Sequence, residues 1–142
     1  MTSTPDAVRL RAGGVAVPPL IRRIELPDMI AYAGATWDWH RLHYDLPFVR
    51  SAGFTAPVVD GQVLGALLAE CLQDWLGPRA VLRRLAFRFT TPVLAGQTVR
   101  CEGATEPSEG PDITVKLRVV IVDTEGATVA VAATSDALVS LA

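Results

Sequence analysis

Apolar and polar positions repeat with a helical period over residues 61–76. The apolar positions, spaced by three or four residues, are Leu64, Leu67, Leu68, Cys71, Leu72 and Trp75. Gly77 and Pro78 follow this stretch, and glycine followed by proline is typical of a helix end. The pattern therefore predicts one long amphipathic helix over 61–76.

Four later segments alternate between apolar and polar residues with a period of two, which is typical of half-buried strands. They cover residues 80–91, 97–104, 112–122 and 127–139, and glycine-containing turns separate the last three from the residues before them. One long helix followed by a run of strands predicts an α+β fold, in which an antiparallel sheet covers the helix on one face.

The first sixty residues predict shorter elements. Residues 21–26 are a plausible first strand, Pro27 begins a short helix that runs toward Gly34, and residues 47–50 form about one helical turn. Residues 1–14 end in two glycines and are expected to be a flexible N-terminal tail. The single folded domain then covers residues 15–142.

Composition narrows the functional classes. A chain of 142 residues that is half apolar can bury one core, so one domain is expected. The formal net charge of −2 disfavours nucleic acid as a partner. No glycine-rich dinucleotide or phosphate motif indicates an organic cofactor. Cys71 and Cys101 lack metal-ligand spacing and are interpreted as buried apolar residues, so no metal is expected.

The N-terminus and the apolar stretches predict the location of the protein. Residues 1–6 show neither a cationic start nor a long apolar run, so export is not expected. No apolar stretch is long enough to span a bilayer. The sequence therefore predicts a cytoplasmic protein without a membrane partner.

Asp38, His43 and Gly61 carry the candidate chemistry. A carboxylate and an imidazole five residues apart can hold one water, the carboxylate as the base and the imidazole as a proton relay. Gly61 begins the predicted long helix, where a backbone N–H can stabilise a negatively charged oxygen with help from the helix dipole. These three residues together indicate an acid–base active site.

These residues resemble the motif of a known family, the MaoC-like (R)-specific enoyl-CoA hydratases and hydroxyacyl-thioester dehydratases, which share the hotdog fold. In this resemblance Tyr32 begins the motif, Asp38 and His43 are the catalytic pair, and Gly61 supplies the oxyanion hole. Residues 52–59 (AGFTAPVV) resemble a second stretch of the family. The resemblance implies a single hotdog domain, an antiparallel sheet wrapped around one long central helix.

Four positions depart from the family pattern. Trp37 stands where the family has glycine, His40 replaces asparagine, Arg41 replaces proline, and Asp60 replaces the histidine before the helix. Trp37, His40 and the neighbouring Trp39 are therefore candidate substrate-binding residues for a bulky acyl group. The alternatives are core or interface positions for the tryptophans and an exposed loop position for His40.

Two further residues are candidates for substrate binding. Asp60 either contacts the substrate or caps the long helix. Arg84 either binds a phosphate of the thioester carrier or belongs to the polar face of a strand.

The resemblance implies the reversible hydration of trans-2-enoyl thioesters, or the dehydration of (R)-3-hydroxyacyl thioesters, without a cofactor. The substrate would be carried on coenzyme A or on an acyl carrier protein. A dehydratase of carrier-bound intermediates in secondary metabolism, a hotdog acyl-CoA thioesterase and a subunit of a heteromeric steroid-type hydratase remain open alternatives. Family members pair edge to edge, so a homodimer is expected, or a heteromer with a second hotdog chain.

Overall fold

The fold consists of a five-stranded antiparallel sheet and one long helix. The computed structural model describes residues 6–142, so the expectation of a flexible tail over residues 1–5 lies outside the described residues. The strands are β1 (Ala16–Arg23), β2 (Ala80–Phe89), β3 (Thr98–Glu106), β4 (Ile113–Val122) and β5 (Thr128–Leu141). Their order in the sheet is β1-β3-β4-β5-β2, which leaves β1 and β2 at the edges.

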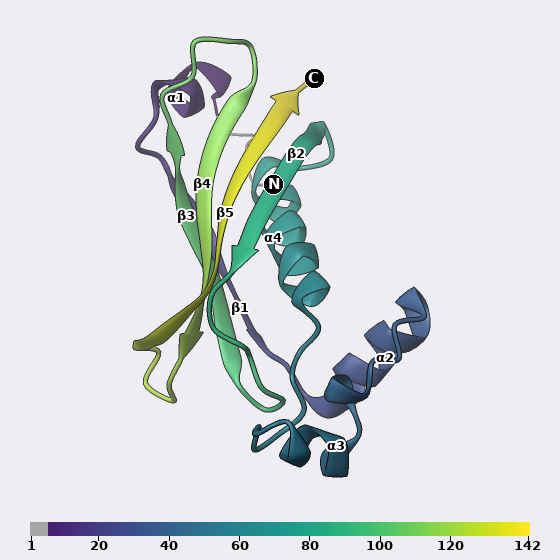
Figure 1. Ribbon diagram of the computed structural model, residues 1–142. Coiled ribbons are helices and arrows are strands. Elements are labelled where there is room, and N and C mark those ends of the chain that lie inside the picture. The colour runs from purple at the N-terminus through teal and green to yellow at the C-terminus, as the bar shows by residue number, and fades with distance from the viewer. Residues whose placement is uncertain (1–5) are drawn as a thin grey trace.

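The long helix α4 (Gly61–Leu76) lies along one face of the sheet (Figure 1). Its bounds match those predicted from the helical period. Alternate residues of β4 point toward the helix and join the core: Ile113, Val115, Leu117, Val119 and Ile121. They meet Leu64, Leu68 and Leu72 of α4 in one buried cluster. The α+β class and the hotdog arrangement, a sheet wrapped around a central helix, are confirmed.

The N-terminal segment differs from the expected flexible tail. Residues Ala7–Ala12 form the helix α1, whose first turn is capped by Asp6, because the Asp6 carboxylate accepts from the Val8 N–H at 2.9 Å. Leu10 is 0% exposed and belongs to the core. A helix of six residues with one buried side chain shows too little periodicity to be recognised in the sequence.

Strand β1 begins earlier and ends earlier than residues 21–26, where a strand was expected. Pro18 and Pro19 made its first half look unlike a strand. Both lie at the irregularity in register between Val17 and Leu20. Since β1 is an edge strand, the missing N–H groups do not interrupt the sheet.

Three short helices form a separate group beside the start of α4. They are α2 (Leu26–Thr36), the 3₁₀ turn η1 (Arg41–His43) and α3 (Leu46–Ser51). Figure 1 shows α2 and α3 below and to one side of the sheet, past the first turn of α4. The short helix expected from Pro27 and the helical turn near residues 47–50 are confirmed. Among the described residues no helix is long and apolar enough to cross a membrane.

The burial of Leu10 generates a stability prediction. Replacing Leu10 by Ala should lower the free energy of unfolding by roughly 2–5 kcal/mol, because the change leaves a cavity in the core. Val8→Ala, on the exposed side of the same helix, is the matched control and should change it by less than about 0.5 kcal/mol. Chemical denaturation followed by circular dichroism measures both. Equal stability of the two variants would mean that α1 does not pack on the sheet.

Candidate active site

An extended segment, Pro57–Val59, joins the loop that carries the catalytic candidates to the sheet. On the loop side the Val58 N–H donates to the Leu42 carbonyl at 2.8 Å. On the sheet side the Val59 N–H donates to the Val93 carbonyl at 2.8 Å, and the Ala95 N–H donates to the Pro57 carbonyl at 2.8 Å. The segment therefore fixes the 37–45 loop beside the first turn of α4.

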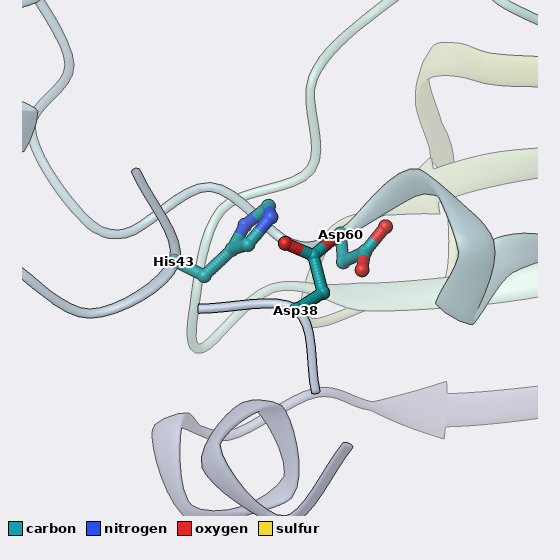
Figure 2. A group of neighbouring side chains, drawn as sticks. All are labelled: Asp38, His43 and Asp60. Carbon is teal, nitrogen blue, oxygen red and sulfur yellow. The ribbon is translucent and has the colours of Figure 1, made fainter. Parts of the chain in front are cut away.

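Three ionisable side chains converge at this junction. Donor atoms of Asp38, His43 and Asp60 all lie within 4.8 Å of one another. Figure 2 shows the Asp38 carboxylate between the His43 ring and Asp60. Within residues 6–142 this is the one group of three or more His, Cys, Asp or Glu side chains that converge in this way. A cation held by the described residues would find its ligands here, and so would a water molecule.

His43 is held in a defined orientation by a hydrogen bond from its ring to the backbone. Its Nδ1 lies 2.7 Å from the Val58 carbonyl oxygen, and a carbonyl can only accept, so Nδ1 carries the hydrogen. In the neutral ring Nε2 then has a free lone pair. Nε2 is therefore the ring nitrogen that the backbone leaves available to a water or a substrate.

The backbone at Trp37 sets the position of Asp38. Trp37 ends α2 in the left-handed conformation, with φ 59° and ψ 30°, and the next N–H, that of Asp38, donates to the Ala33 carbonyl at 3.2 Å. Glycine adopts this conformation more readily than any other residue. Among the described residues Trp37 is the one non-glycine residue with positive φ. Tryptophan at this position therefore strains the turn.

Asp60 has one of its two expected roles, that of the helix cap, and its contact with a substrate stays a prediction. Its Oδ1 accepts from the Gln62 N–H at 2.9 Å, so Asp60 is the N-cap of α4. The same carboxylate lies beside Asp38 and His43. Burial, together with the negative charges of Asp60 and Asp38, raises the pKa of Tyr32. The Tyr32 hydroxyl therefore stays protonated as a donor next to two carboxylates.

Gly61 lies at the edge of an open cleft. The cleft has a volume of about 340 Å³ and is lined by His43, Gly61, Leu64 and Phe89 together with Val58, Val59 and residues 90–93. Within residues 6–142 no acceptor is in hydrogen-bonding position to the Gly61 N–H. A thioester oxygen in the cleft could therefore accept from it at the positive end of the helix dipole.

A second, narrower recess lies behind the catalytic candidates. It is lined by Asp38, His43 and Asp60 together with Met29, Tyr32, Ala33 and Val63. His43 lines both spaces, so the catalytic candidates lie next to the open cleft.

Of the five predicted substrate-binding residues, Asp60 lines the recess, and the other four line neither the recess nor the cleft. Trp37 is 80% exposed and packs edge-on against Trp39, which packs edge-on against Tyr44. The His40 ring accepts from the Leu42 N–H at 3.2 Å and begins η1. Arg84 is exposed on β2, five residues before Phe89. Roles of these four in substrate binding stay predictions.

Sequence reasoning missed two residues of the site. Tyr32 was noted only as the start of a motif, although it lines the recess with Asp38. Phe89 was assigned only to an alternating strand, although its ring lies beside Gly61. The motif position of Tyr32 was a usable signal, whereas nothing local to residues 87–91 pointed to the cleft.

A family model and curated proteins match parts of this chain. A family model described as a MaoC like domain matches residues 16–130. The (R)-specific enoyl-CoA hydratase of Aeromonas caviae is 29% identical over 84 residues, which is 58% of this chain and 63% of that protein. The mitochondrial 3-hydroxyacyl-[acyl-carrier-protein] dehydratase of Arabidopsis thaliana is 31% identical over 72 residues, 51% of this chain and 43% of that protein. This chain spans about half the length of these curated relatives.

Solved structures show the same fold. The (R)-hydratase from A. caviae has a TM-score of 0.78 at 26% identity, covering 88% of this chain and 93% of that chain. A chain of the ChsH1-ChsH2 complex from Mycobacterium tuberculosis has a TM-score of 0.80 at 24% identity, covering 91% of this chain and 97% of that chain.

The cap at Asp60 generates a stability prediction. Asp60→Ala removes the acceptor for the Gln62 N–H and should lower the free energy of unfolding by about 1 kcal/mol. Asp60→Asn keeps an equally good cap without the charge, so it should lie within about 0.5 kcal/mol of the unmodified protein. Thermal and urea unfolding of the two variants measure the difference. An alanine variant as stable as the asparagine variant would show that the cap contributes nothing.

Proposed function

The chain belongs to the MaoC-like domain family, and on that premise we propose that it reversibly hydrates trans-2-enoyl thioesters to (R)-3-hydroxyacyl thioesters. The observation that carries this proposal is the convergence of Asp38 and His43 next to a cleft that Gly61 also lines. A base, a proton relay and an oxyanion donor are the three groups that water addition to a conjugated thioester requires.

In the proposed mechanism one water lies between Asp38 and His43. The His43 Nε2 accepts a hydrogen bond from this water and orients it. Asp38 takes the other proton as the water oxygen bonds to C3 and the C2–C3 π electrons move toward the thioester oxygen. That proton then passes to C2, with His43 as the relay, so one water supplies both the hydroxyl and the hydrogen to the same face.

The Gly61 N–H stabilises the intermediate in this mechanism. Negative charge develops on the thioester oxygen as C3 is attacked, and the N–H at the start of α4 faces it with the helix dipole behind it. Loss of one such donor costs on the order of 10²–10³ in rate in other enzymes.

The two curated relatives favour a second direction for the same chemistry. One is named for hydration of an enoyl-CoA and the other for dehydration on an acyl carrier protein. The same residues catalyse both directions, so a dehydratase of a carrier-bound (R)-3-hydroxyacyl group is the second candidate. Assays of both reactions with both carriers decide between them.

The catalytic pair generates a kinetic prediction. Asp38→Asn and His43→Ala should each lower the rate of hydration of crotonyl-CoA, or of a longer enoyl-CoA, by roughly 10²-fold or more. The loss of absorbance of the conjugated thioester measures this rate. The double variant should lose little beyond the worse single variant, because both residues act on one water.

Asp74→Asn, at an exposed position on α4, is the matched control and should keep the full rate. Near-normal turnover by both Asp38→Asn and His43→Ala would rule out the mechanism. Release of free thiol instead of loss of the double bond would favour the thioesterase alternative.

We also propose that the chain assembles through an edge of its sheet. Strand β2 lies at one edge of the sheet, and an uncovered edge strand offers unpaired N–H and C=O groups to a second strand. Two of the similar structures come from complexes named with two components, ChsH1-ChsH2 and HadBC. Since Asp38, His43 and Gly61 are all present in this chain, a homodimer would hold two complete sites.

Light scattering after size-exclusion chromatography tests the assembly. We expect at least twice the chain mass of 15.2 kDa. A stable monomer would contradict the proposal. A dimer that hydrates no enoyl thioester until a second hotdog chain is added would replace the homodimer with the heteromer.

A further inference from the structure

Two phenylalanines of β2 lie against two glycines of α4. A Cβ atom added to Gly61 would lie 2.7 and 2.8 Å from the two Cε atoms of Phe89, and one added to Gly65 would lie 2.6 Å from Cζ of Phe87. These distances are shorter than any normal carbon–carbon contact. The two glycines, one helical turn apart, therefore form the groove that holds the rings.

The contact with Phe89 explains why residue 61 is a glycine. The φ of Gly61 is not in the left-handed region, so the backbone conformation does not require glycine. An oxyanion hole does not require it either, because every residue except proline has an N–H. The space that the Phe89 ring takes is what excludes a larger residue.

The Phe89 ring is fixed on one side and open on the other. The Phe87 and Phe89 ring centroids are 5.4 Å apart, and Phe87 packs against the core. Phe89 is 50% exposed and lines the open cleft together with His43 and Gly61. An aromatic surface that is already held in place binds a ligand with little further loss of side-chain entropy.

We propose that the open face of Phe89 is the wall against which the acyl thioester lies, so that Phe89 limits the thickness of the acyl group. This inference rests on the proposed function. A thioester whose oxygen accepts from the Gly61 N–H and whose C3 faces His43 lies alongside the Phe89 ring, because the three residues line one cleft. The flat, conjugated part of a straight-chain enoyl thioester fits there, whereas an acyl group branched in three dimensions at C4 collides with the ring.

The kinetic test compares a flat and a thick substrate. Crotonyl-CoA is the flat one, and trans-4,4-dimethylpent-2-enoyl-CoA carries a bulky group next to the reacting double bond. Phe89→Ala should raise the ratio of kcat/KM for the thick substrate to that for crotonyl-CoA by about 10-fold or more, the range in which pocket size discriminates. Phe89→Leu, which keeps more of the packing, should raise it less.

Val81→Ala, also at an exposed apolar position of β2, is the matched control and should leave the ratio unchanged. Circular dichroism and thermal unfolding show whether each variant is folded, and Phe89→Leu takes the place of the alanine variant if the latter is not. A ratio within about twofold of the unmodified protein in a folded Phe89 variant overturns the proposal, since pocket effects are expected to exceed that.

A double-variant experiment tests the steric link between the two residues. Gly61→Ala should lower kcat/KM by about 10-fold or more, because the new methyl group displaces Phe89 into the cleft. In the protein with both Gly61→Ala and Phe89→Ala most of that loss should be recovered, since the residue-61 N–H is still present. Losses that simply multiply in the double variant would show that Phe89 is not the reason for the glycine.

A binding experiment separates this inference from the proposed function. Isothermal titration calorimetry with saturated butyryl-CoA and 4,4-dimethylpentanoyl-CoA needs no reaction. We expect the unmodified protein to prefer butyryl-CoA and Phe89→Ala to lose that preference. The same preference in both proteins overturns the inference even if the enzyme is active. If the binding preference depends on Phe89 but the protein hydrates no enoyl thioester, the role of Phe89 in binding the acyl group is supported and the proposed function is wrong. Failure to bind either thioester overturns both.

Discussion

The candidate active site depends on the extended segment Pro57–Val59. The Val58 N–H donates to the Leu42 carbonyl of the loop, and the Val58 carbonyl accepts from the His43 ring. The Val59 N–H donates to the Val93 carbonyl on the sheet side. One residue later Asp60 caps α4, and Gly61 starts it. The positions of the relay histidine, the helix cap and the oxyanion donor are therefore coupled through four consecutive peptide groups. A shift in this segment would move all three groups together.

The spacing of apolar residues, helical over 61–76 and alternating in the later segments, predicted most of the fold. α4 was predicted with its observed bounds, because sixteen residues of clear helical period end at Gly77. The sheet followed from alternation, which is clear in the first part of β4, where buried and less buried residues alternate from Ile113 to Arg118. Local exceptions were missed: α1 buries only Leu10, and the prolines of β1 are tolerated only because that strand is at an edge. Neither fact can be read from a short window of sequence.

The candidate site was predictable in its residue types and less so in its geometry. The spacing of Asp38, His43 and Gly61 indicated the chemistry, and the structure brings the first two together beside the cleft of the third. The tautomer of His43 and the position of Phe89 depend on residues distant in the sequence, so no local pattern could give them. Trp37 and Trp39 of the loop are exposed and their contacts with a substrate stay predictions, whereas the aromatic side chain that lines the cleft, Phe89, comes from β2.

The stereochemistry of water addition tests the central claim most directly, because a single water held by Asp38 and His43 can reach only one face of the substrate. The measurement is hydration of crotonyl-CoA, or of another accepted enoyl-CoA, in D₂O, with the configuration at C3 and the position of deuterium at C2 determined by NMR. The mechanism predicts an (R)-3-hydroxyacyl product in which deuterium and oxygen were added to the same face. An (S) product, or deuterium added to the opposite face from the oxygen, would contradict it.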